Sequence, residues 1–550
     1  MALTRIGSHQ VDFLPAGTGA VTTLLQDKLR EVVSVKDFGA LGNGSNDDTA
    51  EIQAAITYAA SLATASPNRG MVVYFPPGQY IVSGSLTISS SRVSLRGAGS
   101  SHVRILRAAN YGNTFTIQSE TAGTLNILTR VEISGMTLEH NVGAGTAMTD
   151  AHIKAVAVTY LRIKDVEIVS GKYGIALYGG VDTEIDSCYL TGISTGGVNN
   201  SLVGLGLYDA AASGYALGSA VSLPTEVAVT NTDIFGPLNT GWEYAVLINA
   251  GEDVTFSNCY LGNSKLKNVL IQQNARNKLI LEVAFNNGCY IDGAGEDSVA
   301  IEGDAGDGSQ YIGSVSFDGI DIKGQGGQTN NGIFVSGTAR GGTFSQACVN
   351  LRVAGCRVGD FDETGIRIDG CVNALLASNI VAANNYNNAN TGARGILLGA
   401  ACNRVSVNGG RIGGLSYGAG TSYQKYGIEI VSGATEIHVD GVDVSNNTTG
   451  GVLDSAAAAT TAQRTVWVTN CRGYNGNRAA AIPSMPASTF DQYNPYGAQA
   501  WVYIYGGTVT QIKLNNQLLA SASGQSFPVG PGDRVSITYS AAPDWVWWPQ

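Results

Sequence analysis

The chain has 550 residues, of which 72 are glycine and 13 are proline, and only 14% are charged. High glycine with little proline and no Gly-X-Y period excludes collagen, and a hydrophobic content of 44% excludes a disordered chain. The net charge of −11 argues against nucleic acid as the main ligand. Because no apolar run reaches the roughly 18 residues of a membrane span and the N-terminus lacks the apolar stretch of a secretion signal, we expect a protein that is made in the cytosol and does not insert into membranes.

The segment 47–63, DDTAEIQAAITYAASLA, predicts a helix. Asp48 and Glu51 have the spacing of a capping box. An apolar stripe follows at Ile52, Ala55, Ile56 and Ala59. The residues after this helix form a repeat structure, whose open end needs a cover, so we expect the helix to cap it.

A short pattern recurs along the middle of the chain: apolar, any, apolar, any, then a small or turn-forming residue. Examples are VEISG at 131–135, VTFSN at 254–258 and VSVNG at 405–409. The fifth residues of the copies are Gly135, Asp165, Ser187, Asn231, Asn258, Asn287, Gly319, Gly355, Asn379, Gly409, Gly441 and Asn470. Their spacing averages about 30 residues, and the alternation of period two predicts strands.

A second strand lies between most copies, as in GIALY at 174–178, SVAIE at 298–302 and GIRID at 365–369. A unit of about 30 residues with two or more short strands is one coil of a right-handed parallel β-helix, here with about 12 coils. Cys188, Cys259, Cys356 and Cys471 directly follow the fifth residue. This position predicts a buried ladder of thiols in place of disulfides or a zinc site, with a reactive thiol as the alternative.

The repeat ends near residue 477, and a proline-containing linker follows. Residues 498–550 read as four to six antiparallel strands, which predicts a separate small β-sandwich. Its aromatic residues Trp545, Trp547 and Trp548 suit a core or a subunit interface, and the alternative is a platform for carbohydrate. The fold class expected for the chain is therefore all-β.

The junction before the repeats contains Lys36-Asp37-Phe38-Gly39-Ala40, then Gly42-x-Gly44-x-x-Asp47-Asp48-Thr49, and MVVYFPPGQYIV follows at 71–82. These motifs closely resemble the start of the β-helix in bacteriophage tailspikes with a pectate-lyase-like fold. The resemblance implies a homotrimer on a virion tail that binds, and usually cleaves, capsule or O-antigen of the host.

On this basis we expect a neck or virion-attachment segment (1–33), the β-helix (34–480), a linker (481–497) and the sandwich (498–550). Only about 30 residues precede the junction, so we expect the long anchoring heads of the family to be missing. We expect attachment through the short segment or through another protein of the phage tail or baseplate.

Glycoside hydrolysis needs two carboxyl groups on either side of the scissile bond. The residues that close the second strands, Asn249, Gln272, Glu302, Ser336, Asp369 and Gly399, should stack in one outward line. Glu302 and Asp369 would stand two coils apart and are the candidate catalytic pair. Arg367 is the candidate for binding an acidic sugar or for lowering the pKa of a carboxyl, and Trp242 is a further candidate for binding substrate.

Apolar residues beside this line favour a trimer interface instead, with Glu302 and Asp369 as ion-pair partners. Acidic loops offer alternative catalytic carboxylates, namely Asp292, Glu296, Asp297, Asp304 and Asp307 in one stretch and Asp360, Asp362 and Glu363 in another. No cofactor and no resident metal is expected.

The resemblance predicts a polysaccharide depolymerase, with a hydrolase favoured over a lyase. The main alternative is a non-enzymatic receptor-binding adhesin or tail structural protein with the same fold, and a free pectin-degrading enzyme is a third possibility. Fragment release from polysaccharide separates the first class from the second.

Overall fold

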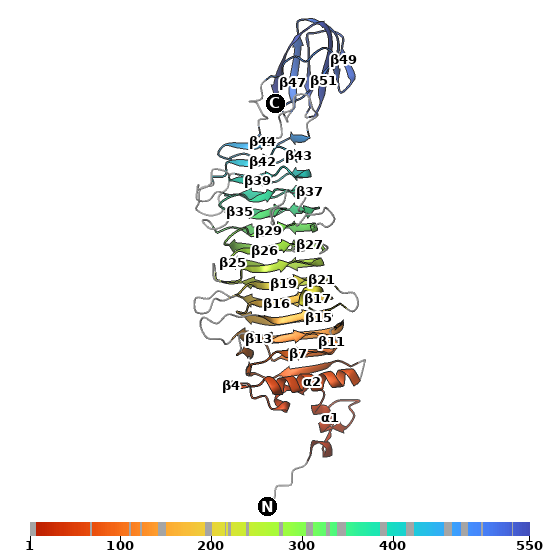
Figure 1. The fold of residues 1–550 in the computed structure, drawn as a ribbon, viewed down its shortest axis with the longest axis vertical. Helices are drawn as coiled ribbons and strands as arrows, with labels where there is room; N and C mark the ends of the chain where they lie inside the picture. Colours follow the sequence, from red (N-terminus) through yellow and green to blue (C-terminus); the bar gives the residue numbers. More distant parts are fainter. Residues whose placement is uncertain are drawn as a thin grey trace, which may run out of the picture. The chain divides into compact units, whose positions relative to one another are not determined.

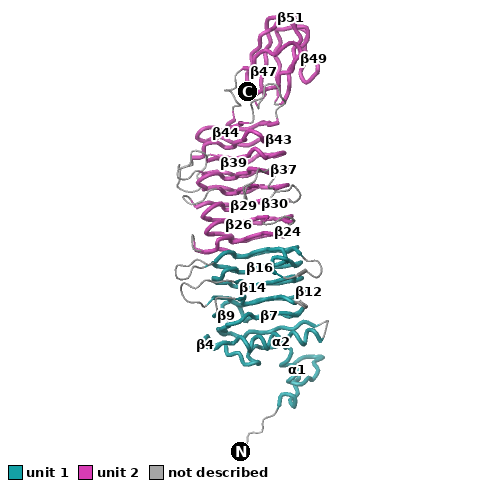
Figure 2. Tube along the Cα trace, viewed as in Figure 1, with its two compact units in different colours: residues 1–233 teal, residues 234–550 magenta. Residues whose placement is uncertain are grey.

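The computed structural model describes residues 7–65, 69–108, 112–121, 124–140, 150–192, 201–214, 216–217, 222–237, 241–273, 279–303, 312–325, 331–337, 348–384, 393–413, 423–455, 465–474, 482–496, 499–530 and 532–549. These residues form two compact units, 1–233 and 234–550 (Figure 2). Within each unit, successive coils of the chain lie in parallel register (Figure 1). We call each coil a rung.

In the described ranges, helices are few and lie mostly in the N-terminal part of the chain. They are η1 (Ser8–Gln10), α1 (Leu25–Leu29), η2 (Val35–Phe38), α2 (Thr49–Ala65) and η3 (Ala210–Ser213). Among the described residues, no helix is long and apolar enough to span a membrane.

Successive rungs of unit 1 contribute strands to three faces, except that the first rung, with β3 (Val33–Ser34) and β4 (Asn43–Asp47), has no described strand on the first face. The first face contains β7 (Leu86–Ile88), β10 (Phe115–Ile117), β14 (Ala151–Val156), β16 (Tyr173–Tyr178) and β19 (Val203–Tyr208). The second and third faces are formed by β3 (Val33–Ser34), β4 (Asn43–Asp47), β5 (Met71–Phe75), β6 (Gly78–Val82), β8 (Val93–Gly97), β9 (Val103–Arg107), β13 (Leu128–His140), β15 (Val158–Val169), β17 (Gly180–Asp186), β18 (Tyr189–Thr191), β21 (Pro224–Thr230) and β22 (Asp233–Phe235). Small additional sheets contain β1 (Asp12–Phe13) with β2 (Thr23–Leu24), and β11 (Ser119–Thr121) with β12 (Thr124–Asn126) and β20 (Ala216–Leu217).

Unit 2 repeats the same three faces. The first face contains β23 (Tyr244–Ile248), β26 (Lys267–Gln272), β29 (Val299–Glu302), β32 (Ile333–Ser336), β36 (Ile366–Ile368), β39 (Arg394–Leu398), β42 (Tyr426–Ile430) and β44 (Gly450–Asp454). The second face contains β24 (Gly251–Ser257), β27 (Ile280–Asn286), β30 (Ile312–Asp318), β33 (Cys348–Val349), β34 (Arg352–Ala354), β37 (Cys371–Ala377), β40 (Asn403–Asn408), β43 (Thr435–Asp440) and β45 (Val466–Thr469). The third face contains β25 (Tyr260–Ser264), β28 (Tyr290–Ala294), β31 (Asp321–Lys323), β35 (Arg357–Gly359), β38 (Ile380–Ala382) and β41 (Arg411–Ile412).

The core of unit 2 is built from identical or similar side chains stacked rung upon rung. Phe256, Phe285 and Phe317 are in register and fully buried, with ring centroids 4.7 and 5.2 Å apart and ring planes tilted by only 7°. Alternating residues of each strand point inward, so the apolar side chains of period two form this core. The predicted β-strands of the repeats are therefore confirmed.

The corner between the second and third faces is made by one residue with a left-handed backbone. All but one of the residues expected at this position have φ between 48° (Asn231) and 66° (Gly135). The exception is the copy near 375, where Ser378 makes the corner in place of Asn379. Val353 pairs with Leu376 there, so the expected frame of this copy is wrong by one residue.

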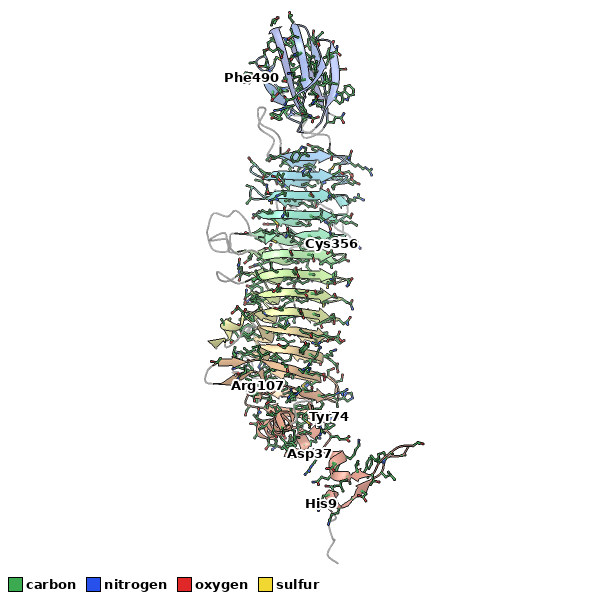
Figure 3. The ribbon with its side chains drawn as sticks, turned by 90° about the vertical axis from the view of Figure 1, so that its right-hand side faces the viewer. His9, Asp37, Tyr74, Arg107, Cys356 and Phe490 are labelled. Carbon is green, nitrogen blue, oxygen red and sulfur yellow. The ribbon has the colours of Figure 1, made fainter. Side chains whose placement is uncertain are left out.

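The position after the corner points into the core. Cys188, Cys259 and Cys356 are buried there and Cys471 is largely so, and all eight cysteines are free thiols (Figure 3 labels Cys356). Burial raises the pKa of Cys188 to about 12 and also raises the pKa of Cys356 and Cys471. These four thiols pack in or beside the core, as the sequence position after each corner predicted.

Helix α2 covers apolar residues with the predicted stripe, since Ile52, Ala55, Ile56 and Ala59 are all buried. The capping box expected from Asp48 is not observed. The Asp48 carboxylate instead accepts hydrogen bonds from the backbone N–H groups of Leu41 (2.6 Å) and Gly42 (3.1 Å). Asp48 therefore fixes the glycine-containing junction that precedes the helix.

The C-terminal part of unit 2 is a sandwich of two antiparallel sheets. They contain β46 (Asp491–Tyr493), β51 (Arg534–Ala541), β48 (Thr508–Leu514) and β49 (Gln517–Ala520) in one sheet, and β50 (Gln525–Val529), β47 (Ala500–Tyr505) and β52 (Asp544–Pro549) in the other. Strand β46 lies in the segment expected to be a linker. Trp545 and Trp547 are buried in the shared core, whereas Trp548 is 52% exposed.

Two histidines form a buried polar cluster in unit 1. The rings of His140 and His152 lie 4.3 Å apart, and Thr114 Oγ1 lies 3.0 Å from Nδ1 of His152. Burial lowers the pKa of His140 to about 4, helped by the positive charge of Arg107 (Figure 3), and burial also lowers the pKa of His152. Both rings are therefore neutral in the folded state at neutral pH.

This cluster predicts a loss of stability in mild acid. A histidine whose folded pKa lies below its unfolded value of about 6.5 destabilises the fold as the pH falls below 6.5, by up to about 1.4 kcal/mol per pH unit for each ring. We expect the free energy of unfolding to fall between pH 6.5 and pH 4.5, and His140→Gln to reduce this slope. Denaturant unfolding across this range tests it, with His102→Gln as the control, and a slope unchanged in His140→Gln would contradict it.

Candidate functional site

Members of the line expected on the first face of unit 2 are in register, but they are not all outward, because Asn249 and Ser336 are buried (8% and 2% exposed). Gln272 pairs with Glu302, and Glu302 pairs with Ser336. The next rung places Asp369 beside Ser336, because the Asp369 N–H donates to the carbonyl of Val335. Glu302 and Asp369 therefore lie two rungs apart on one face, about 9.6 Å along the stack.

Glu302 is held by neighbours on its own face. Its Oε2 accepts a hydrogen bond of 2.7 Å from Nε2 of Gln272, and its Oε1 lies 3.9 Å from Nζ of Lys267. The Lys267 ammonium is itself bound at 2.7 Å by Glu296. Nearby carboxylates therefore raise the pKa of Lys267 in spite of its burial, and the lysine stays charged.

Asp369 is engaged by the residue expected to act with it. Arg367 donates from Nε to Oδ1 (3.1 Å) and from Nη2 to Oδ2 (3.0 Å), which is a two-pronged ion pair. The Arg367 guanidinium also lies 5.0 Å from the centre of the Phe334 ring. Both charged groups remain partly exposed, at 37% and 29%, so a ligand on this face can reach them.

Other predicted site residues are placed less favourably. Trp242 is completely buried, so its ring presents no surface to a ligand. Asp304 and Asp307 lie outside the described residues. Asp297 is buried and accepts hydrogen bonds from N–H and Nδ2 of Asn331, at 3.0 and 2.8 Å, which gives it a structural role.

A second carboxylate cluster lies where the third face ends. Asp292 pairs with Lys323 across one rung, Lys323 pairs with Gly359 across the next, and Asp360 follows directly. Burial raises the pKa of Asp360 to about 6 and also raises the pKa of Asp292, while Lys323 acts against both shifts. Asp362 and Glu363, the neighbours of Asp360, are partly exposed.

The sequence did not reveal that Asp292 and Lys323 share this cluster. Lys323 follows its corner residue by four positions, and Asp292 follows its own corner by five. The additional residue is Gly288, after which Tyr290 stacks on Tyr260 with ring centroids 5.7 Å apart. Allowing for one inserted residue after Asn287 alone would have aligned the two side chains.

Comparison with known proteins supports the fold. A family model described as rhamnogalacturonase A/epimerase, pectate lyase-like, matches residues 32–294. The tail spike protein of an Escherichia phage is 46% identical over 54 residues, which are 10% of this chain and 7% of that protein. Mannuronan C5-epimerase AlgE3 of Azotobacter vinelandii is 49% identical over 73 residues, 12% of this chain and 4% of that protein. The chain thus spans less than a tenth of the length of these curated relatives.

The solved tailspike protein of E. coli bacteriophage HK620 in complex with pentasaccharide matches 98% of this chain and 97% of its own, with a TM-score of 0.58 and 12% identity. This likeness shows the fold, a right-handed parallel β-helix of the kind found in tailspikes. The resemblance to bacteriophage tailspikes with a pectate-lyase-like β-helix is confirmed, as is the all-β fold with its helical cap and C-terminal sandwich.

The raised pKa of Asp360 predicts that its ionised carboxylate lowers the stability of the folded protein. Its folded pKa lies above the ordinary value of about 3.9, so ionisation destabilises the fold as the pH rises from 4 through 6. Asp360→Asn should raise the free energy of unfolding by roughly 2–3 kcal/mol at pH 8 and have little effect at pH 4. Unfolding measured at both pH values, with Glu363→Gln as control, tests this; equal effects at pH 4 and pH 8 would refute it.

Proposed function

We propose that this protein is a phage tailspike that binds and cleaves a bacterial capsule or O-antigen polysaccharide during attachment to the host. The observation that supports it most is the pair Glu302 and Asp369, two carboxylates on one outward line of a tailspike-like β-helix. The family model and the similar proteins include enzymes that act on polysaccharides, which supports a polysaccharide-modifying enzyme.

The two carboxylates have different surroundings, which suits different roles. Arg367 donates two hydrogen bonds to Asp369, and Asp369 is proposed to activate water as the general base. Glu302 accepts one hydrogen bond from the Gln272 amide and lies 3.9 Å from the Lys267 ammonium, which is a looser contact than the two-pronged ion pair of Asp369, and Glu302 is proposed to protonate the leaving oxygen. The spacing of two rungs, shortened by the side chains, fits an inverting hydrolase, for which carboxyl groups stand roughly 6.5–9.5 Å apart.

The sugar chain is proposed to lie along the first face. Phe334 with Arg367, and Tyr426 with Arg394 at 5.1 Å, give this face aromatic rings beside cations. Arg394 is also paired with Glu429. Rings suit the apolar faces of sugars and a guanidinium suits a carboxylate, so a polysaccharide that contains uronic acid is the expected class of substrate.

Neutral substitutions test the catalytic pair. Glu302→Gln and Asp369→Asn should each lower the rate of polysaccharide cleavage by roughly 10²–10⁴, because neither amide can carry the proton. Binding of the polysaccharide should persist. The purified protein is incubated with capsules and O-antigens of many serotypes, and the products are sized; Glu436→Gln, exposed on the second face, is the control.

Three results would redirect this assignment. Near-normal cleavage by both variants would reject the pair and move the test to Asp292→Asn and Asp360→Asn. Binding without any release of fragments by the unmodified protein would favour the adhesin. Products with an unsaturated uronate, detected by their ultraviolet absorbance, would indicate a lyase in place of a hydrolase.

The protein is also proposed to be a homotrimer. None of residues 7–32 is buried, and Leu14, Val21 and Leu29 are 62–70% exposed. On the first face of unit 2, Leu247, Leu397 and Leu453 point outward and are partly exposed. Apolar side chains left in water in this way suit contacts with other copies of the chain.

Light scattering tests the trimer. Three chains of 57.0 kDa give about 171 kDa, and we expect this mass at micromolar concentration. The paired substitution Leu14→Ser with Leu29→Ser should weaken the assembly, whereas Ser45→Ala should not. A stable mass of one chain for the unmodified protein would overturn the proposal.

A further inference from the structure

A groove with a volume of about 480 Å³ crosses the second face of unit 2. It runs over five successive strands, β24, β27, β30, β34 and β37, and so extends about 19 Å along the stack. It lies on a different face from Glu302 and Asp369.

The floor of the groove exists because three outward residues are small. Thr255, Ala284 and Ser316 are in register on neighbouring rungs. The next residues in this line are Arg352, whose Nε binds Oδ1 of Asp318 at 2.8 Å, and Leu375, which lines the groove on its last strand.

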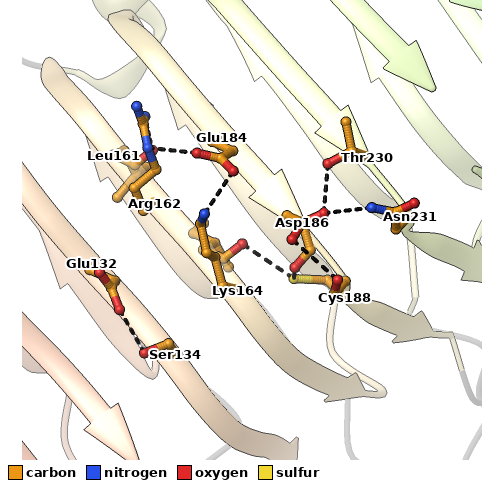
Figure 4. A network of polar contacts seen from close by, with 12 residues as sticks. Glu132, Ser134, Leu161, Arg162, Lys164, Glu184, Asp186, Cys188, Thr230 and Asn231 are labelled. Atoms are coloured by element: carbon orange, nitrogen blue, oxygen red, sulfur yellow. Dashed lines mark hydrogen bonds and ion pairs between the residues drawn. The ribbon is translucent and has the colours of Figure 1, made fainter. Parts of the chain in front are cut away.

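The same outward line in unit 1 is filled. Glu132, Arg162 and Glu184 are in register there, and Arg162 Nε lies 2.8 Å from Glu184 Oε2 (Figure 4). Lys164 also binds Glu184, at 2.7 Å. Long paired side chains cover the face of unit 1, and their replacement by threonine, alanine and serine opens the face of unit 2.

One wall of the groove carries a polar side chain on every rung. These residues are Asp253, Glu282, Ser314, Asn350 and Asn373. All five have a left-handed backbone, with φ between 53° and 60°. A left-handed backbone costs a residue other than glycine about 1–2 kcal/mol. Glycine would therefore be less strained at this position, yet every rung of the groove carries a polar side chain there.

We propose that this groove binds a stretch of the polysaccharide apart from the site of cleavage. The polar groups repeat at the rung spacing of about 4.8 Å, and an extended chain of sugar rings repeats at nearly the same distance. The floor of small residues leaves room for the rings, and the amide, hydroxyl and carboxylate groups match the hydroxyl groups of roughly four successive sugars.

The charges of the groove select the kind of sugar. Asp253 and Glu282 are exposed on adjacent rungs at one end, where they would repel a uronate and attract an amino group. The groove is therefore expected to take neutral or amino sugars at that end. Because the inference rests on the proposed action on polysaccharide, it deepens that function by assigning a second site to the same chain.

The test compares groove variants in the inactive background Glu302→Gln with Asp369→Asn, so that ligands stay intact. Ala284→Leu with Ser316→Leu fills the floor, and Asn350→Gly with Asn373→Gly removes two polar side chains without backbone strain. Ser94→Leu, on the same outward line in β8, is the matched control. The probe is a glycan array of long and short bacterial oligosaccharides with neutral, amino and uronic sugars.

We expect both groove variants to bind long neutral or amino oligosaccharides at least tenfold more weakly, and Ser94→Leu to bind them normally. Unchanged affinity in the filled variant would overturn the groove site. A change of mass by light scattering in the filled variant alone would show that the groove is a contact between copies, which also overturns it. Absence of cleavage by the unmodified protein with groove-dependent binding retained would reject the depolymerase and leave the groove standing.

Discussion

The whole β-helix depends on one backbone constraint, a single left-handed residue at the corner between two strands. Because one residue turns the chain at nearly every corner, the strands on both sides stay in register from rung to rung, and the one inserted residue at Gly288 is absorbed before Tyr290 pairs with Tyr260. Glycine and asparagine accept this conformation at the lowest cost, which explains why these residue types recur at this position. Inward side chains then stack on their equivalents, and burial of that stack stabilises each rung through its neighbours.

Because of the same constraint, the outward side chains of successive rungs stand above one another in columns. The residues that occupy each column then decide which ligands the surface can bind and which reactions it can catalyse. Glu302 and Asp369 share one column at a separation set by two rungs, and the groove on the second face arises where another column becomes small over three rungs. Neither feature needs a change in the backbone. A fold of this kind gains a site by substitution at outward positions alone, while the core and the corners stay as they are.

The repeats, the helix over 49–65 and the buried thiols were predictable because each leaves a periodic mark in the sequence. The frame at Ser378 was not, since Asn379 resembles a corner residue; in the fold its amide instead accepts from N–H of Cys356 and donates to the carbonyl of Val353. Asp48 was assigned to a helix cap but serves the junction, and β46 was hidden in a proline-containing stretch. In the candidate site, the Glu302 and Asp369 line followed from strand spacing. The burial of Trp242, the raised pKa of Asp360 and the groove depend on neighbours that only the three-dimensional structure brings together.

The Phe256, Phe285 and Phe317 stack has a consequence for how the chain finds its alignment during folding. Repeated coils are nearly interchangeable partners, so a growing β-helix can pair a coil with the wrong neighbour and still satisfy its backbone hydrogen bonds. Three flat rings bounded by Val353 on the next rung break this equivalence, because a shift by one coil would set a ring against a smaller side chain and leave a void. The three stacked phenylalanines therefore favour the native pairing of coils. They distinguish the correct partner coil, some 30 residues away in the sequence, from other coils whose repeat sequence is similar.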